Sequence, residues 1–347
     1  MMLFAALALS LHLSPVLPPA PNRQPQLAAG KAITALVFGS GESIWFSRSS
    51  DQGATWSPPS KIADLPKLLL GRHRGPRVVV SGETLLVSAA PAGGDLLCWR
   101  STDAGRTWSK PAAINDQPTS AREGLQAMAA DAQGRVAAAW LDDRAPGGKR
   151  LYGAFSSDAG ATWSKNTLLY ESPSGSICQC CHPSLVALGR GEFAVMWRNV
   201  IEGSRDLYTL RIRDRKPVSA AMKLGTGTWK LDACPMDGGG LALDRGRIVS
   251  AWRREHDIYL SAAGKPEIHI GEGQDVALAA GAGGPYAIWR SAQGIVARLP
   301  GSAAVTTLSR TGASPAVAAW PDGAVLAAWE ENGSIAIRRL DRSGRGN

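Results

Sequence analysis

The sequence lacks the patterns that define membrane-spanning and fibrous proteins. No uninterrupted apolar run of about 20 residues occurs in its 347 residues, which excludes a transmembrane helix. No heptad pattern is sustained, which excludes a coiled coil, and hardly any segment has the periodicity of an amphipathic helix. Charged residues make up only 19% and hydrophobic residues 44%, so the chain can bury a large core and is not disordered.

Aromatic residues are scarce, with one exception. Phe and Tyr number five each, whereas Trp numbers 12. A repeated structural unit with a Trp in each copy would produce this imbalance. The 39 Gly and 22 Pro are too few for collagen and are typical of a β protein rich in turns.

The balance of charges limits the classes of partner. The chain has 38 basic and 29 acidic residues, a formal net charge of +9, which is compatible with nucleic acid or an acidic ligand. The basic residues are scattered, and no Lys/Arg block with interleaved aromatic residues occurs. We therefore expect a monomer whose partner is a small anionic ligand or a glycan, and no nucleic-acid partner.

The N-terminal residues indicate export. Residues 1–13, MMLFAALALSLHL, form an apolar stretch of signal-peptide length, although no positive residues precede it. Small residues and prolines follow. We predict a signal peptide over residues 1–20, a linker over residues 21–32 and a periplasmic or secreted location. A buried N-terminal helix is the alternative.

One octapeptide recurs three times along the chain. The pattern S-x-D-x-G-x-T-W occupies residues 49–56, 101–108 and 156–163. The Asp can accept backbone N–H groups across a tight turn, the Gly permits a positive φ, and the Trp can anchor the turn on a sheet. Three copies at regular spacing predict a repeat protein.

Apolar strands that end in Trp form a second repeat. They occupy residues 136–143, 193–199, 248–254, 286–290 and 325–331. Another short apolar run precedes each, and we expect innermost strands to begin near Pro76, Leu125, Ser184, Gly239, Asp275 and Pro315. Short strands, Gly-rich turns and a period of about 35–57 residues predict an all-β propeller of four-stranded blades.

The octapeptides resemble the Asp boxes, or BNR repeats, of the sialidase superfamily. The resemblance extends over residues 33–340 and implies a single sialidase-like β-propeller domain over residues 33–347, with ligand chemistry at the centre of one face. Six innermost strands predict a six-bladed β-propeller. Seven blades are left open, because residues 33–65 add outer strands without a clear inner one. The resemblance implies that the Asp boxes are elements of the fold.

The resemblance also implies an arginine cluster that holds a substrate carboxylate. Arg74 stands where the family has its R-I-P motif, Arg198 follows the third inner strand, and Arg253 lies in the sequence AWRRE. Convergent guanidinium groups suit a carboxylate because they form bidentate, charge-assisted hydrogen bonds. Arg122 and Glu123 add charge beside the same channel mouth. Salt bridges between blades are the alternative role for the three arginines.

The remaining sialidase machinery looks incomplete. Ala313 stands where the family has its Tyr nucleophile, His182 stands where it has a helper Glu, and the acid/base segment contains only Asp95. We therefore expect no ordinary exo-sialidase chemistry and assign no catalytic residue. A glycoside hydrolase with rearranged catalytic residues is left open, and so is whether the protein is an enzyme.

Cysteine and histidine gather at two points. The run C-Q-C-C-H occupies residues 178–182, and C-P-M opens the next blade at residues 234–236. Both precede an inner strand of neighbouring blades, so we expect them to meet at the channel mouth. Soft sulfur ligands with imidazole favour copper(I) or zinc. The candidate metal ligands are Cys178, Cys180, Cys181, His182, Cys234 and Met236.

The same cysteines permit other chemistry. Exported proteins commonly form disulfides, and Cys181 with Cys234 is one pairing, although five cysteines leave at least one unpaired. If the first run is extended, Cys178, Cys180 and His182 share one face and Cys181 takes the other. A metal site, a disulfide-locked interaction scaffold and a reactive thiol all stay open. The leading interpretation is a propeller that binds a small anionic or metal-containing ligand, with no cofactor certain.

Overall fold

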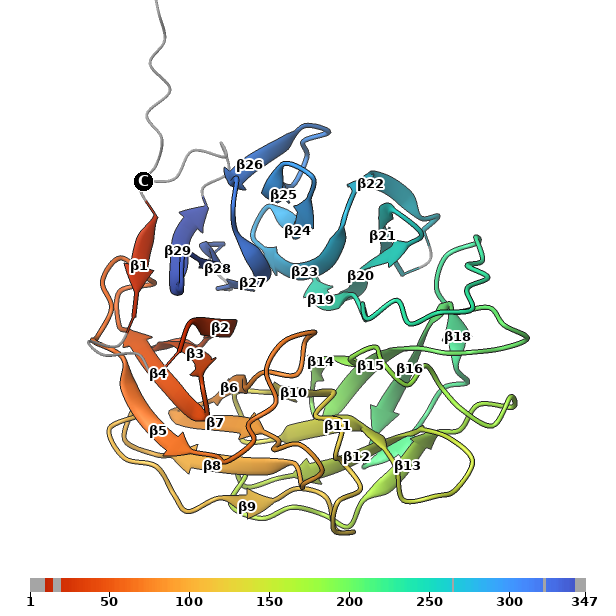
Figure 1. The fold of residues 1–347 in the computed structure, drawn as a ribbon, viewed down its shortest axis with the longest axis horizontal. Coiled ribbons are helices and arrows are strands. Elements are labelled where there is room, and N and C mark those ends of the chain that lie inside the picture. Colours follow the sequence, from red (N-terminus) through yellow and green to blue (C-terminus); the bar gives the residue numbers. More distant parts are fainter. Residues whose placement is uncertain (1–9, 15–19, 264, 321–322, 341–347) are drawn as a thin grey trace, which may run out of the picture.

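Seven antiparallel sheets are arranged as blades around a central axis in the computed structural model of the protein (Figure 1). The structure describes residues 10–14, 20–263, 265–320 and 323–340. None of these residues belongs to a helix, and accordingly no helix in the described ranges is long and apolar enough to cross a membrane.

The first four blades follow one another along the chain. Blade 1 contains β2 (Asn22–Ala29), β3 (Thr34–Ser40), β4 (Ser43–Ser49) and β5 (Ser60–Asp64). Blade 2 contains β6 (Arg77–Ser81), β7 (Thr84–Ala89), β8 (Leu97–Ser101) and β9 (Ala112–Ala113). Blade 3 contains β10 (Gln126–Ala130), β11 (Val136–Asp142), β12 (Arg150–Ser156) and β13 (Thr167–Tyr170). Blade 4 contains β14 (Ser184–Gly189), β15 (Glu192–Arg198), β16 (Leu207–Arg213), β17 (Lys216–Pro217) and β18 (Met222–Lys223).

Three further blades complete the disc. Blade 5 contains β19 (Gly240–Asp244), β20 (Arg247–Arg254), β21 (Asp257–Ala262) and β22 (Ile268–Glu272). Blade 6 contains β23 (Gln274–Gly281), β24 (Gly284–Ser291), β25 (Gly294–Arg298) and β26 (Val305–Ser309). Blade 7 contains β27 (Ala313–Ala319), β28 (Val325–Glu331), β29 (Ser334–Leu340) and β1 (Leu11–Leu13).

The first long strand of each blade lines the axis. Neighbouring inner strands contact one another around the ring in the order β2, β6, β10, β14, β19, β23 and β27, and β27 contacts β2 again. At the outer edge of blade 7, β1 pairs antiparallel with β29, with Leu11 opposite Ile337. Segments from the two ends of the chain therefore meet in one sheet.

The all-β propeller expected from the sequence is confirmed, with seven blades rather than six. Six inner strands begin within two residues of their predicted positions. The seventh is β2, which occupies most of the segment that the sequence assigned to a linker, residues 21–32. This linker assignment is wrong because Asn22 and Gln24, two polar residues, are buried in the strand. The predicted signal peptide, residues 1–20, lies outside the described residues except at residues 10–14 and 20.

The repeated tryptophans fill the spaces between blades. They lie on the second strands of blades 3 to 7 and are at most 2% exposed: Trp140, Trp197, Trp252, Trp289 and Trp329. Each belongs to an apolar cluster that also contains side chains of the preceding blade, as Trp140 shares a cluster with residues of blade 2. This recurring position accounts for five of the 12 tryptophans, and the three Asp boxes account for three more.

The three Asp boxes are matching turns after the third strand of blades 1 to 3. In the first, the hydroxyl of Ser49 and the main-chain N–H of Thr55 donate to Asp51, and the N–H of Gly53 donates to Ser49. The boxes that begin at Ser101 and Ser156 repeat these bonds. The hydrogen bonds within each octapeptide hold its turn in shape. This requirement accounts for the strict pattern of the octapeptide.

Candidate functional site

Three sulfur atoms converge in the segment between β13 and β14. Sγ of Cys178 lies 3.7 Å from Sγ of Cys180 and 3.5 Å from Sγ of Cys181. All three lie within 4.8 Å of one another, and their side chains are buried. Residues 179–181 form a turn. The expectation that Cys181 faces away from the other two is therefore wrong, because a turn does not alternate its side chains as a strand does.

The next blade contributes to the same cluster. Cys234, which is exposed, interacts with Cys180, and Met236 packs against the three thiols. The two segments that precede neighbouring inner strands therefore meet. We call Cys178, Cys180 and Cys181 the thiol cluster.

His182 does not join the thiol cluster. Its ring stacks on the ring of His73, with centroids 4.2 Å apart and planes at 27°. Nε2 of His182 lies 3.1 Å from the carbonyl oxygen of Gly239. Burial, together with the positive charges of His73 and Arg77, holds the pKa of His182 well below its usual range. The expectation that His182 shares a face with Cys178 is wrong.

The surroundings favour the ionised form of Cys178 over those of Cys180 and Cys181. Hydrogen bonds with Cys180 and Cys181, together with the positive charge of Arg198, hold the pKa of Cys178 far below its usual range. The hydrogen bond to Cys178 raises the pKa of Cys180, and burial raises that of Cys181. Nη1 of Arg205 also donates to Sγ of Cys178, at 3.3 Å. Two guanidinium groups therefore stabilise a thiolate there.

No two of the five cysteines are joined in a disulfide. The sulfur separations in the thiol cluster exceed the roughly 2.05 Å of an S–S bond. Cys98, the fifth cysteine, lies apart in the apolar core of blades 2 and 3, where burial raises its pKa to about 12.

The three arginines of the expected cluster, Arg74, Arg198 and Arg253, each have hydrogen-bond partners within the protein. Arg198 is 1% exposed, and it donates to the main-chain carbonyls of Asp237, Arg205 and Arg253. These bonds tie blade 4 to the loop and strand of blade 5. Arg253 and Arg198 both lie against the ring of Trp229. Arg198 therefore links two blades, as the alternative prediction had it, but its partners are main-chain carbonyls rather than carboxylates.

The other charged residues predicted to bind a ligand, Arg74, Glu123 and Arg122, form ion pairs with neighbouring side chains. Arg74 donates to the carbonyl and carboxylate of Glu123, and Lys149 lies 3.5 Å from the same carboxylate. Arg122 is largely exposed and pairs with Asp143 at 3.0 Å. Of the five predicted ligand-binding residues, Arg74 lines the central basin described next.

A basin of about 750 Å³ lies at the start of the inner strands, bordered by blades 1, 2, 5, 6 and 7. Its charged lining consists of Arg23, Arg72, Arg74, Arg290, His73, Asp275 and Glu330. Arginines thus outnumber carboxylates in the lining. Within the described part of the chain, Arg72 and Arg290 have no ion-pair partner. Met236, which packs on the thiol cluster, and Ala313 also line the basin.

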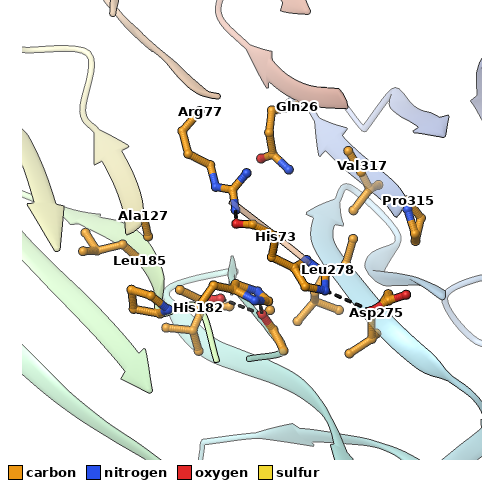
Figure 2. A pocket seen from close by; sticks show the side chains of 18 of the residues that line it. Gln26, His73, Arg77, Ala127, His182, Leu185, Asp275, Leu278, Pro315 and Val317 are labelled. Carbon is orange, nitrogen blue, oxygen red and sulfur yellow. Dashed lines mark hydrogen bonds and ion pairs between the residues drawn. The ribbon is translucent and has the colours of Figure 1, made fainter. Parts of the chain in front are cut away.

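A narrower cavity of about 160 Å³ continues from the basin into the channel, and the two share His73 and Asp275 (Figure 2). Nε2 of His73 lies 2.9 Å from Oδ1 of Asp275. Arg77, the first residue of β6, also lines the cavity. The sequence did not identify Arg77 or Asp275 as residues of a site, although Arg77 directly follows the H-R-G-P motif at residues 73–76.

Seven blades, Asp boxes between outer strands and a central basin define a β-propeller of the BNR-repeat type. The chain belongs to the BNR repeat-like domain family, whose profile matches residues 40–215, just over half of the chain. The resemblance to sialidase-like propellers is thereby confirmed. A comparison with curated proteins finds no match.

Solved structures share the fold at low sequence identity. An ulvan lyase of polysaccharide lyase family PL25, bound to -[GlcA(1-4)Rha3S]-, has a TM-score of 0.58 at 11% identity, covering 92% of this chain and 94% of its own. The intramolecular trans-sialidase from Ruminococcus gnavus, in complex with oseltamivir carboxylate, has a TM-score of 0.54 at 9% identity and covers both chains fully, at 100% each. The Aleuria aurantia lectin has a TM-score of 0.53 at 10% identity, covering 93% and 94%.

Proposed function

We propose that this protein is an exported β-propeller that binds one soft metal ion, copper(I) or zinc(II), through its thiol cluster. The sulfur spacing carries the proposal. With metal–sulfur bonds of about 2.3 Å, tetrahedral thiolate ligands lie about 3.8 Å apart. The separations of 3.7 Å and 3.5 Å from Cys178 to Cys180 and Cys181 are close to that value.

The surroundings of the cluster suit a metal–thiolate centre. Arg198 and Arg205 place positive charge beside Cys178, and this charge offsets the negative charge that bound thiolates add. Cys234 comes from the next blade and offers a fourth thiolate through its interaction with Cys180. The thioether of Met236 packs on the cluster, and thioether and thiolate ligands favour copper(I).

Metal analysis with thiol counting tests this function. Protein expressed in a bacterial periplasm is purified without chelators, and its bound metals and its thiols after unfolding are measured. We expect one equivalent of copper or zinc in the wild type and less than a tenth of that in Cys178→Ser. The control Cys98→Ser alters a buried thiol apart from the cluster and keeps the full equivalent.

Two results would contradict the metal proposal. One is a wild-type protein that takes up no copper or zinc under reducing conditions. The other is a count of two or more missing thiols in metal-free protein, which would favour the disulfide-locked scaffold. Export is tested separately by fractionation of cells that express residues 1–347, with periplasmic or secreted protein as the expected result.

A second candidate function is the binding of an anionic sugar in the basin. Arg72 and Arg290 lie there without ion-pair partners in the described residues. Guanidinium groups bind carboxylates by charge-assisted hydrogen bonds. Two structural neighbours bind a glucuronate-containing saccharide and oseltamivir carboxylate, which is consistent with a glycan ligand.

Calorimetric titration with glucuronate and N-acetylneuraminate tests this second function. We expect binding to weaken about tenfold in Arg290→Ala, the loss of one charge-assisted interaction. Arg245→Ala, an exposed arginine that does not line the basin, is the matched control. Equal binding of glucose would argue against charge recognition. A fluorogenic sialoside should show no turnover above a heat-killed control, and clear turnover would favour the rearranged glycoside hydrolase.

A further inference from the structure

Arg77 is a buried cation without an anionic partner. It is 9% exposed, at the start of β6, and it donates to the main-chain carbonyls of His73, Gly75 and Pro76. No carboxylate of the described residues lies within ion-pair distance of it. Burial lowers the pKa of Arg77 to about 10, which reflects the cost of holding this charge away from water. Arginines this buried are almost always paired.

Arg198 provides a comparison within the same molecule. It is even more enclosed, at 1% exposed, and its donors also go to three main-chain carbonyls. The guanidinium of Arg198, however, lies near the thiol of Cys178 and lowers its pKa. No acidic side chain of the described residues lies within ion-pair distance of Arg77.

The cavity beside Arg77 has further polar groups without partners. Gln26 lines it from β2, and its side-chain amide has no hydrogen bond to the described residues. Nδ1 of His182 is buried and has no hydrogen-bond partner there either. Figure 2 shows Arg77, Gln26 and His182 around one cavity. Because Nε2 of His182 donates to the carbonyl of Gly239 and burial disfavours the charged ring, its Nδ1 is an acceptor, and the amide of Gln26 is the donor that the fold leaves open here.

The carboxylate of Asp275, which lines the same cavity, does not pair with Arg77. Its Oδ1 pairs with the ring of His73 instead. The carbonyl of His73 in turn accepts from Arg77. His73 therefore lies between the two charges, and the basin opens on the Asp275 side. An anion from the basin reaches Arg77 past His73.

We propose that the channel cavity binds a small monovalent carboxylate, with the guanidinium of Arg77 as its counter-charge and the amide of Gln26 as a further donor. The volume of about 160 Å³ is roughly five times the ~30 Å³ that a water molecule takes in the liquid, enough for an anion the size of acetate. One unpaired guanidinium matches one negative charge, and its planar fork matches a carboxylate. This site is separate from both the thiol cluster and the arginines of the basin rim.

Calorimetric titration with sodium acetate in chloride-free buffer of constant ionic strength tests the proposal. We expect saturable binding to the wild type and no detectable binding of acetamide, the neutral analogue of the same shape. Arg77→Met should weaken acetate binding more than tenfold. Arg77→Lys should weaken it less, because lysine retains the charge and loses the fork. The control Arg245→Met removes an exposed arginine that lines neither the cavity nor the basin and should leave binding within twofold.

Folding of each variant is checked by near-ultraviolet circular dichroism. If Arg77→Met does not fold, Arg77→Lys and Gln26→Leu test the proposal in its place. Each should weaken acetate binding several-fold. Three outcomes would overturn the proposal: no saturable binding of acetate to folded wild type, unchanged binding in the variants of Arg77, or loss of binding instead in Arg290→Met, a variant of the basin lining. The last would place the anion in the basin.

Discussion

Nη1 of Arg205 donates to Sγ of Cys178 across 3.3 Å, and Nε of the same guanidinium donates to the main-chain carbonyl of Leu231 at 2.8 Å. Leu231 lies three residues before Cys234 in the loop of the next blade. One arginine therefore contacts the thiol cluster and the segment that brings the fourth sulfur to it. In the proposed metal site Arg205 would be a positioning residue, because it contacts a ligand, Cys178, and not the metal.

Arg205→Gln should lower metal affinity about tenfold, the lower end of the effect of outer-shell partners on metal sites. The substitution removes the charge beside Cys178 and loosens the loop at Leu231. Affinity is measured by competition with a chelator of known strength. Arg213→Gln, an exposed arginine that pairs with Glu192, is the control and should leave affinity unchanged. Equal affinities in the two variants would refute a role for Arg205 at the metal.

Gly105→Ala should destabilise the propeller more than Gly203→Ala. Both glycines have a positive φ, 80° and 75°, which costs other residues roughly 1–2 kcal/mol. A Cβ at Gly105 would lie 2.2 Å from the buried ring of Phe46 in the preceding blade, whereas a Cβ at Gly203 would meet no atom within 4 Å. Overpacking adds about 1–3 kcal/mol for Gly105 alone. Thermal unfolding midpoints measure the difference. Similar midpoints would show that Phe46 can move to admit the added Cβ without loss of stability.

The Asp box at Asp51 should contribute its full stabilisation above about pH 4 and lose it as the pH falls toward 2. Hydrogen bonds from Ser49 and Thr55 lower the pKa of Asp51 from 3.8 to about 2. A carboxyl whose pKa is lower in the folded state stabilises that state when ionised, and the effect disappears as pH falls through the folded pKa. We expect wild type to unfold at a higher temperature than Asp51→Asn at pH 6, with the gap shrinking between about pH 4 and pH 2. A gap that stays constant down to pH 2 would contradict this.

Local sequence patterns predicted most of the fold. The boxes at residues 49–56 and 101–108 have hydrogen bonds that depend only on residues within the octapeptide, so their presence in the sequence was sufficient. The strand β2 escaped prediction because Asn22 and Gln24 occupy buried positions. The partner of Gln24, Glu330, is 306 residues away, and no local pattern contains that contact.

The candidate site was predictable in part. Blade adjacency predicted that residues 178–182 and 234–236 are neighbours, because consecutive inner strands lie side by side. The directions of Cys181 and His182 were wrong, because they depend on a turn that the spacing of the cysteines does not reveal. Arg77 was not predicted because its distinguishing feature is that it has no anionic partner in the described residues. That feature depends on how the inner strands pack, which the local sequence does not show.

The last prediction concerns two tryptophans in equivalent positions of neighbouring blades. Trp140 on β11 and Trp197 on β15 are at most 1% exposed. Nε1 of Trp140 donates to Oδ2 of Asp142 at 2.8 Å, and that carboxylate is buried. Nε1 of Trp197 is buried and has no hydrogen-bond partner in the described part of the chain. The two indoles therefore differ in the polar contact they make.

Trp140→Phe should cost more stability than Trp197→Phe, although both leave a similar void. The first substitution removes a donor from a buried carboxylate, a loss of about 1.5–3 kcal/mol. The second removes an N–H that was already unpaired, so only the packing loss remains. Arg144 still donates to Asp142 at 2.8 Å and 3.0 Å, which places the difference at the lower end of that range. Urea unfolding of both variants measures it through the shift in midpoint at constant slope. A larger loss in Trp197→Phe would mean that its contacts with Tyr170 and Tyr208 outweigh the hydrogen bond of Trp140.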